Sequence, residues 1–141
     1  ITGGYSTSSG GGLLVQQSAV LTDCNIYEND ASSYGTGGGG VGIHTGGAAV
    51  LNSCAIFDNT AWNGGAVRVG NHAGGSAVLT KCFIYGNSAA RYAGGVFVTG
   101  GSVATLDYCK LTGNSVGTTA GGLGIWYSAS ATLSYSEITG N

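Results

Sequence analysis

Apolar residues alternate with small or polar residues in short runs that recur along the whole chain. The clearest run is residues 49–59, AVLNSCAIFDN, in which Ala49, Leu51, Cys54 and Ile56 take the apolar places. Related runs begin at residues 19, 77, 104 and 131. Alternation over so few residues predicts short strands that bury one face.

The runs recur at a nearly constant period. Each ends in an asparagine, and the steps between these asparagines are 30, 28, 27 and 27 residues; they are Asn29, Asn59, Asn87, Asn114 and Asn141. Between the runs, a pair of small residues precedes an apolar–any–apolar triplet, as in Gly65-Ala66-Val67-Arg68-Val69. Each repeat of about 27 residues is therefore predicted to carry three short strands and no helix.

A repeat of this size cannot bury its apolar face alone, but it can do so by coiling onto the next repeat about 4.8 Å away. The sequence thus predicts an all-β fold: a right-handed parallel β-helix, or solenoid, of about five rungs. We expect residues 1–141 to form a single β-helix segment. Leucine-rich repeats would need a different leucine spacing and a helical segment, and a β-propeller would need a longer period.

Equivalent residues should stack into ladders along such a coil. We expect three apolar ladders in the interior, headed by Val41, Leu21 and Ile26. At one corner the asparagines Asn29, Asn59, Asn87 and Asn114 should form a ladder whose amides bond to one another and to the backbone.

The cysteines also share one place in successive repeats; they are Cys24, Cys54, Cys82 and Cys109, and Ser136 takes that place in the fifth. One interpretation is a buried ladder of free thiols that behave as small apolar residues. Disulfides between adjacent turns, such as Cys24–Cys54 and Cys82–Cys109, are an alternative. A metal site is the third alternative, but sulfurs in one line cannot form a tetrahedron.

No constellation typical of catalysis is present. Carbohydrate-active enzymes use clustered or paired carboxylates, and here only Glu28 and Asp58 share a repeat place, with Asp30 beside them. We interpret that place as a solvated turn, with a Ca²⁺ site as the alternative. We interpret His44 and His72 as ordinary loop histidines. The sequence predicts no catalytic residue, no cofactor and no metal.

Aromatic residues show two patterns on the outside of the predicted coil. One is an outward stack on three successive turns: Tyr27, Phe57 and Tyr85. The other falls in the joint after the asparagine: Tyr34, Trp62 and Tyr92. Aromatic faces on one ridge suit a sugar or protein ligand, so this ridge is the candidate ligand site.

Composition narrows the range of partners. Charged residues make up only 7% of the chain and the net charge is −2, so we predict no nucleic-acid partner. No apolar run approaches the length of about 20 residues that a membrane span needs. The chain begins and ends within a repeat, so we expect a piece of a longer solenoid, or a segment that associates with itself end to end or laterally.

The segment Phe57-Asp58-Asn59, followed by Gly64-Gly65-Ala66-Val67, resembles the repeats of chlamydial polymorphic outer membrane proteins. Tyr27-Glu28-Asn29 with Gly39-Gly40-Val41 is a looser copy. The resemblance implies a secreted autotransporter passenger with an adhesive or structural duty and offers no catalytic residues.

Together these features favour a non-enzymatic β-helix at the cell surface or outside the cell. It would be an adhesin-like passenger or the building block of a surface fibre, with glycans or host surface proteins as further partners. The alternative is a carbohydrate-binding β-helix, or a carbohydrate-active one resembling polysaccharide lyases or hydrolases.

Overall fold

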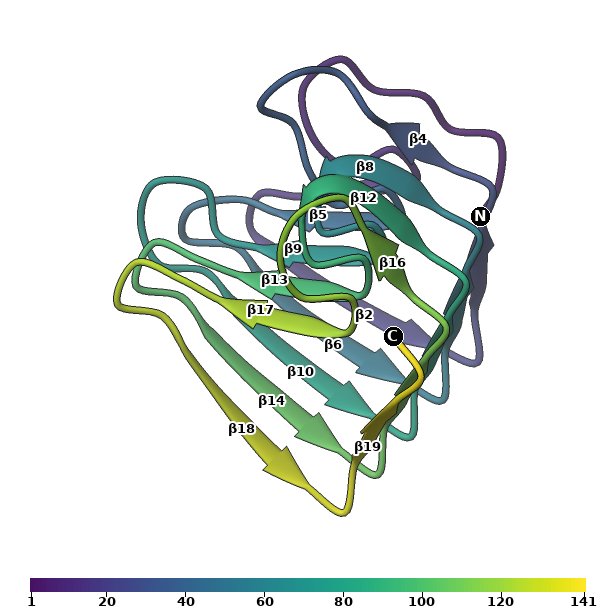
Figure 1. Ribbon diagram of the computed structural model, residues 1–141. Coiled ribbons are helices and arrows are strands. Elements are labelled where there is room, and N and C mark those ends of the chain that lie inside the picture. The colour runs from purple at the N-terminus through teal and green to yellow at the C-terminus, as the bar shows by residue number, and fades with distance from the viewer.

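The chain winds into stacked turns whose strands pair in parallel with their equivalents one turn away, as the predicted β-helix requires (Figure 1). This computed structural model describes all of residues 1–141. It contains strands and no helix, so no helix could span a membrane. The strands form four sheets that run along the stack.

The first two sheets contain five strands each. Sheet 1 consists of β1 (Leu13–Val15), β5 (Val41–Ile43), β9 (Val67–Val69), β13 (Val96–Val98) and β17 (Leu123–Ile125). Sheet 2 consists of β2 (Ser18–Thr22), β6 (Ala48–Asn52), β10 (Ser76–Thr80), β14 (Val103–Asp107) and β18 (Ser130–Ser134). Sheet 1 is formed by the apolar–any–apolar triplets, and sheet 2 by the first halves of the repeated runs that end in asparagine.

The other two sheets flank the asparagine corner. Sheet 3 consists of β3 (Asn25–Tyr27), β7 (Ala55–Phe57), β11 (Phe83–Tyr85), β15 (Lys110–Thr112) and β19 (Glu137–Thr139). Sheet 4 consists of β4 (Asp30–Ala31), β8 (Thr60–Asn63), β12 (Ser88–Tyr92) and β16 (Ser115–Val116).

Sheet 4 corrects the expectation of three strands per rung, because it adds a fourth strand to four of the turns. Each of these strands begins with a polar residue followed by a small apolar one, and Ala31, Ala61 and Ala89 point into the core and are buried. These strands are two to five residues long and share only their first two positions, so this segment reads as a loop in the sequence.

The predicted interior ladders are present in register. Val41, Val67, Val96 and Leu123 pair in sheet 1. In sheet 2 the ladder is Leu21, Leu51, Leu79, Leu106 and Leu133. In sheet 3 it is Ile26, Ile56, Ile84, Leu111 and Ile138. These side chains belong to one apolar core along the axis of the coil, apart from those of the last turn.

The asparagine ladder is confirmed, and it extends to Asn141. The Nδ2 of Asn59 donates to the Oδ1 of Asn87 at 2.9 Å and to the carbonyl of Ile26 at 3.0 Å. That Oδ1 also accepts from the backbone N of Asn59 at 3.1 Å. The pattern repeats at each turn, so the corner satisfies backbone groups that would otherwise be buried without partners.

The residue before each asparagine adopts a left-handed backbone conformation. Its φ is +53° at Glu28 and Asp58, and +60° to +65° at Gly86, Gly113 and Gly140. This requirement explains why glycine fills the place in the later turns. The carboxylates of Glu28 and Asp58 therefore mark a turn.

Candidate ligand-binding site

The outer face of sheet 1 is covered by other segments of the chain, although the outer face of a β-helix sheet ordinarily faces solvent. The central residues of its strands are in register and point away from the core; they are Leu14, Gly42, Arg68, Phe97 and Gly124. Alternation would expose them, yet Arg68 is only 8% exposed and Phe97 only 2%. The loop after β4 contacts Arg68 and the end of β12 packs against Phe97, so these two segments cover the face.

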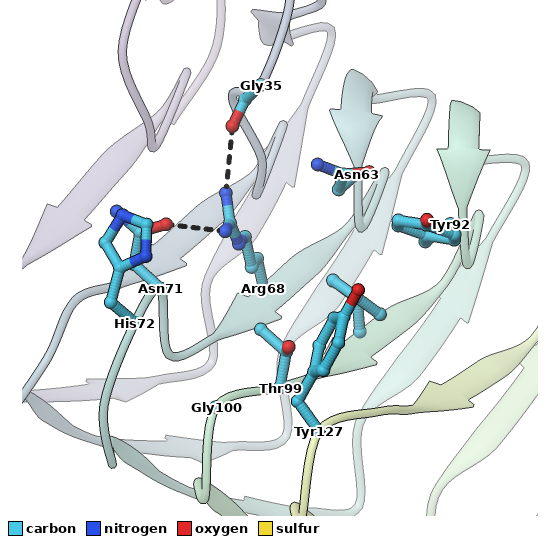
Figure 2. A pocket seen from close by; sticks show the side chains of 10 residues that line it. Gly35, Asn63, Arg68, Asn71, His72, Tyr92, Thr99, Gly100 and Tyr127 are labelled. Carbon is cyan, nitrogen blue, oxygen red and sulfur yellow. Dashed lines mark hydrogen bonds between the residues drawn. The ribbon is translucent and has the colours of Figure 1, made fainter.

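A cavity of about 560 Å³ lies under this cover (Figure 2). The first part of its wall is Gly35 from the loop after β4, Asn63 at the end of β8, Arg68 of β9, and Asn71 and His72 after β9. The second part is Tyr92 at the end of β12, Phe97 of β13, Thr99 and Gly100 after β13, and Tyr127 after β17. We call it the Arg68 cavity. Its volume is in the range of small-molecule sites.

Arg68 lies at the centre of the wall without a negative partner. Its Nη1 donates to the carbonyl of Gly35 at 3.3 Å and its Nη2 donates to the Oδ1 of Asn71 at 2.6 Å, as Figure 2 shows. Its Nε is buried and has no hydrogen-bond partner. A guanidinium offers five N–H donors, so two neutral acceptors leave it under-satisfied. Burial lowers the pKa of Arg68 below its ordinary value, but an arginine remains charged in proteins.

Asn63 contributes a second orphan atom, of the opposite hydrogen-bonding type. Its Nδ2 donates to the carbonyl of Thr36 at 3.1 Å, which fixes the orientation of the amide. Its Oδ1 is then buried without a donor, and the residue is only 7% exposed. Buried polar atoms in native proteins almost always have partners, so Asn63 Oδ1 and Arg68 Nε, which lie beneath the surface of the cavity wall, are exceptions.

Aromatic rings form the far side of the cavity. The ring of Tyr92 packs on Phe97 with centroids 5.3 Å apart, and on Trp126 with centroids 5.0 Å apart. The guanidinium of Arg91, which is not part of the cavity wall, lies 4.7 Å from the centre of the Tyr92 ring. Tyr127, which is 69% exposed, offers its ring to solvent at the mouth.

A glycine makes room for the arginine. A Cβ added to Gly37 would lie 2.4 Å from the Cδ of Arg68 and 2.4 Å from the carbonyl oxygen of Asn63. Only glycine therefore allows the loop after β4 to close over the Arg68 side chain. The position of the guanidinium is thus built into the backbone of the neighbouring turn.

The structure divides the predicted aromatic ridge. Tyr34 and Trp62 do lie together, with ring centroids 4.9 Å apart, and Tyr34 is 83% exposed. Tyr92 does not join them, because one extra residue in β12 shifts the register so that Tyr92 pairs with Asn63. The bulge turns the Tyr92 side chain to the other face of sheet 4, where it lines the Arg68 cavity.

The cysteines lie where a stacked ladder places them, and all four are free thiols. The Sγ of Cys82 donates to the carbonyl of Leu51, one turn back, at 3.3 Å, and Cys109 does the same to Leu79. Burial raises the pKa of Cys54. Interaction with the Cys109 thiol, followed by burial, raises the pKa of Cys82, and the same interaction lowers the pKa of Cys109 to about 7.

The other candidates from the sequence have separate outcomes. The two histidines lie at different places. His72 lines the Arg68 cavity, whereas His44 lies outside it and has a buried Nε2 without a hydrogen-bond partner. The carboxylates of Glu28, Asp30 and Asp58 lie outside the cavity wall, and no metal-binding group of three His, Cys, Asp or Glu residues forms.

Sequence reasoning missed Arg68, which was one of four basic residues without a common repeat place. The available signal was its position: it is a long cation at the centre of a triplet whose equivalents are Leu14, Gly42, Phe97 and Gly124. Alternation assigns such a residue to solvent, and nothing in the local pattern shows that a loop covers it.

Comparison with known proteins identifies one family. The family described as right-handed beta helix region matches residues 11–141, and this match confirms the predicted right hand of the coil. No curated protein and no solved structure matches the chain.

Proposed function

The chain belongs to the right-handed β-helix family, and on that premise we propose a non-enzymatic, extracellular, adhesive duty for it. A rigid stack of turns presents the Arg68 cavity to a ligand on another surface. The observation that carries the proposal is the cavity itself, whose wall combines a buried cation, polar atoms and aromatic rings. These are the features of a binding site.

The composition of the wall favours binding over cleavage. Its titratable side chains are Arg68, His72, Tyr92 and Tyr127, and none is a carboxylate. Glycoside hydrolysis in most enzymes needs two carboxyl groups that flank the scissile bond. A hydrolase would therefore have to use other residues, whereas carbohydrate binding needs only the groups present.

The scaffold suits exposure outside the cell. Its corner is held by repeated side-chain hydrogen bonds at every turn, and its outer faces carry few charges. The resemblance of Phe57-Asp58-Asn59 and Gly64-Gly65-Ala66-Val67 to repeats of polymorphic outer membrane proteins supports a passenger of this kind. A second form of this proposal is a structural role, in which copies of the chain associate laterally into a surface fibre.

The test is a paired measurement on the purified chain. Retention on panels of glycans and cell surfaces is measured together with the release of reducing or unsaturated sugar ends from polysaccharides. Retention without released ends is the expected result. Released ends would overturn the non-enzymatic part of the proposal. An absence of retention on every surface would overturn the adhesive part, and electron microscopy of the same sample would then decide whether filaments form.

A further inference from the structure

We propose that Tyr108 and Tyr135 form a site of oxidative cross-linking, at which a one-electron oxidant of the peroxidase class joins the two rings as dityrosine. The new carbon–carbon bond links the fourth and fifth repeats of the coil on its outer surface. The inference goes beyond the adhesive role and does not depend on the Arg68 cavity.

The backbone holds the two tyrosines at the same place in successive turns. Both lie at the corner between sheets 2 and 3, in the bends that directly follow β14 and β18. The backbone N of Tyr108 donates to the carbonyl of Ser134 at 3.0 Å, so the two corners are one rung apart, about 4.8 Å. Both residues are left-handed, with φ of +52° at Tyr108 and +47° at Tyr135. Because they share this uncommon conformation, their side chains leave the backbone in the same direction.

The two rings are stacked on each other and open to solvent. Their centroids are 4.7 Å apart and their planes differ by only 11°. Tyr108 is 55% exposed and Tyr135 is 80% exposed. An oxidant in solution therefore reaches both rings without any opening of the fold.

No other two tyrosine rings are in contact. In each of the remaining ring contacts a tyrosine packs on a phenylalanine or a tryptophan. Phe57 separates Tyr27 from Tyr85 on the outside of sheet 3. Tyr34, which is exposed, packs on Trp62. The folded chain therefore offers one pair of phenols for coupling within the molecule.

The stacked geometry suits the coupling of two phenoxyl radicals. The peroxidase removes one electron and one proton from each phenol and passes them to hydrogen peroxide, which leaves as two waters. The unpaired electron of each radical occupies orbitals perpendicular to the ring, so facing rings overlap at the carbons ortho to the oxygens. A bond forms between two of these carbons, and the proton on each moves to an oxygen, which restores both phenols. Because the fold already holds the rings together, this coupling is a step within one molecule.

The experiment treats the whole chain, at low concentration, with a haem peroxidase and hydrogen peroxide, and isolates the monomer by gel filtration. The thiols are then reduced and alkylated, so that a disulfide does not imitate the change in mass. We expect a monomer that has lost two hydrogen atoms, shows dityrosine fluorescence and yields on digestion two peptides joined through Tyr108 and Tyr135. A monomer without this link would overturn the proposal, and so would a link between other tyrosines in its place.

Variants test whether stacking at this corner directs the coupling. Tyr108→Phe and Tyr135→Phe each remove one exposed phenol and should lower the dityrosine fluorescence of the monomer at least tenfold. Tyr34→Phe is the matched control, because Tyr34 is 83% exposed but contacts no tyrosine ring, and it should leave the yield unchanged. Lys81 takes the equivalent place one turn before Tyr108, with φ of +54°. Lys81→Tyr in the Tyr135→Phe background should therefore restore a link to Tyr108. Fluorescence that survives Tyr108→Phe, or a Lys81→Tyr variant that restores no link, would overturn the proposal.

Discussion

At the scale of single residues, the molecule depends on side chains that complete the hydrogen bonding of the backbone. Asn87 illustrates this: its Oδ1 accepts from the N and Nδ2 of Asn59, and its Nδ2 donates to Ile56, Tyr85 and Asn114. The asparagine thus bridges its own turn and both neighbours. Its role is structural, and its geometry leaves no donor for a ligand.

Asn87→Ala should be among the most costly substitutions in the chain. It leaves several buried groups unpaired at about 1–3 kcal/mol each, so we expect the free energy of unfolding to fall by roughly 3–5 kcal/mol. Chemical denaturation measures the loss. Asn52→Ala is the matched control, because no hydrogen bond of the Asn52 side chain is present, and it should stay within about 0.5 kcal/mol of wild type. Equal losses in the two variants would contradict the ladder.

The buried thiols should make the free energy of unfolding decrease as the pH rises into the alkaline range. Burial holds the pKa of Cys54 above the 9.0 of an exposed thiol, so the folded state keeps the proton while the unfolded state releases it. The stabilisation is complete below pH 9 and is lost as the pH rises toward the folded pKa. Cys54→Ser, which copies the hydroxyl at Ser136, should reduce the fall in Tm between pH 8 and pH 10. An identical fall in both proteins would show that other groups cause it.

At the scale of elements, each inner strand pairs in parallel with its equivalents in the turn before and the turn after. On the outside of sheet 3 the rings of Tyr27, Phe57 and Tyr85 stack with centroids 4.9 Å apart and nearly parallel planes. The predicted outward stack is thus present. The stack connects three successive turns. In the next turn Thr112 takes the equivalent place, so the row of rings ends there.

Phe57→Ala removes both stacking contacts from the middle of this row. We expect a loss of about 1–3 kcal/mol in the free energy of unfolding, together with a weaker near-ultraviolet circular dichroism signal from the tyrosines. Thr112→Ala, at the equivalent place on β15, should be nearly neutral. A neutral Phe57→Ala would mean that the stack follows from the fold and does not stabilise it.

At the scale of the whole molecule, stability should be a sum over turns and the contacts between adjacent turns, as in other solenoids. Figure 1 shows the reason: each turn lies against the one before and the one after it. In the leucine ladder, Leu51 pairs directly with Leu79, and Leu79 with Leu106, so one full turn separates Leu51 from Leu106.

Double-mutant cycles with Leu→Ala test this view. Leu51 and Leu79 share a packing contact, so their substitutions should couple by about 0.5–3 kcal/mol. Leu51 and Leu106 have a turn between them, and their substitutions should add within about 0.5 kcal/mol. Urea unfolding of the single and double variants supplies both values. Strong coupling across the intervening turn would require a core that repacks as one unit.

The sequence by itself determined the coil, its period, the three apolar ladders and the asparagine corner. It could do so because the same residue type recurs at the same place in every turn, and only stacking of like on like buries all of them together. The resemblance and the composition added an adhesive interpretation, which stays a prediction.

Only the tertiary structure decided where the candidate site lies. Arg68 is buried because a loop from another turn closes over it, and Tyr92 enters the cavity because one extra residue in β12 reverses its direction. Both depend on departures from the repeat. A period describes what the turns have in common, so the features in which one turn differs from its neighbours appear only once the chain is folded.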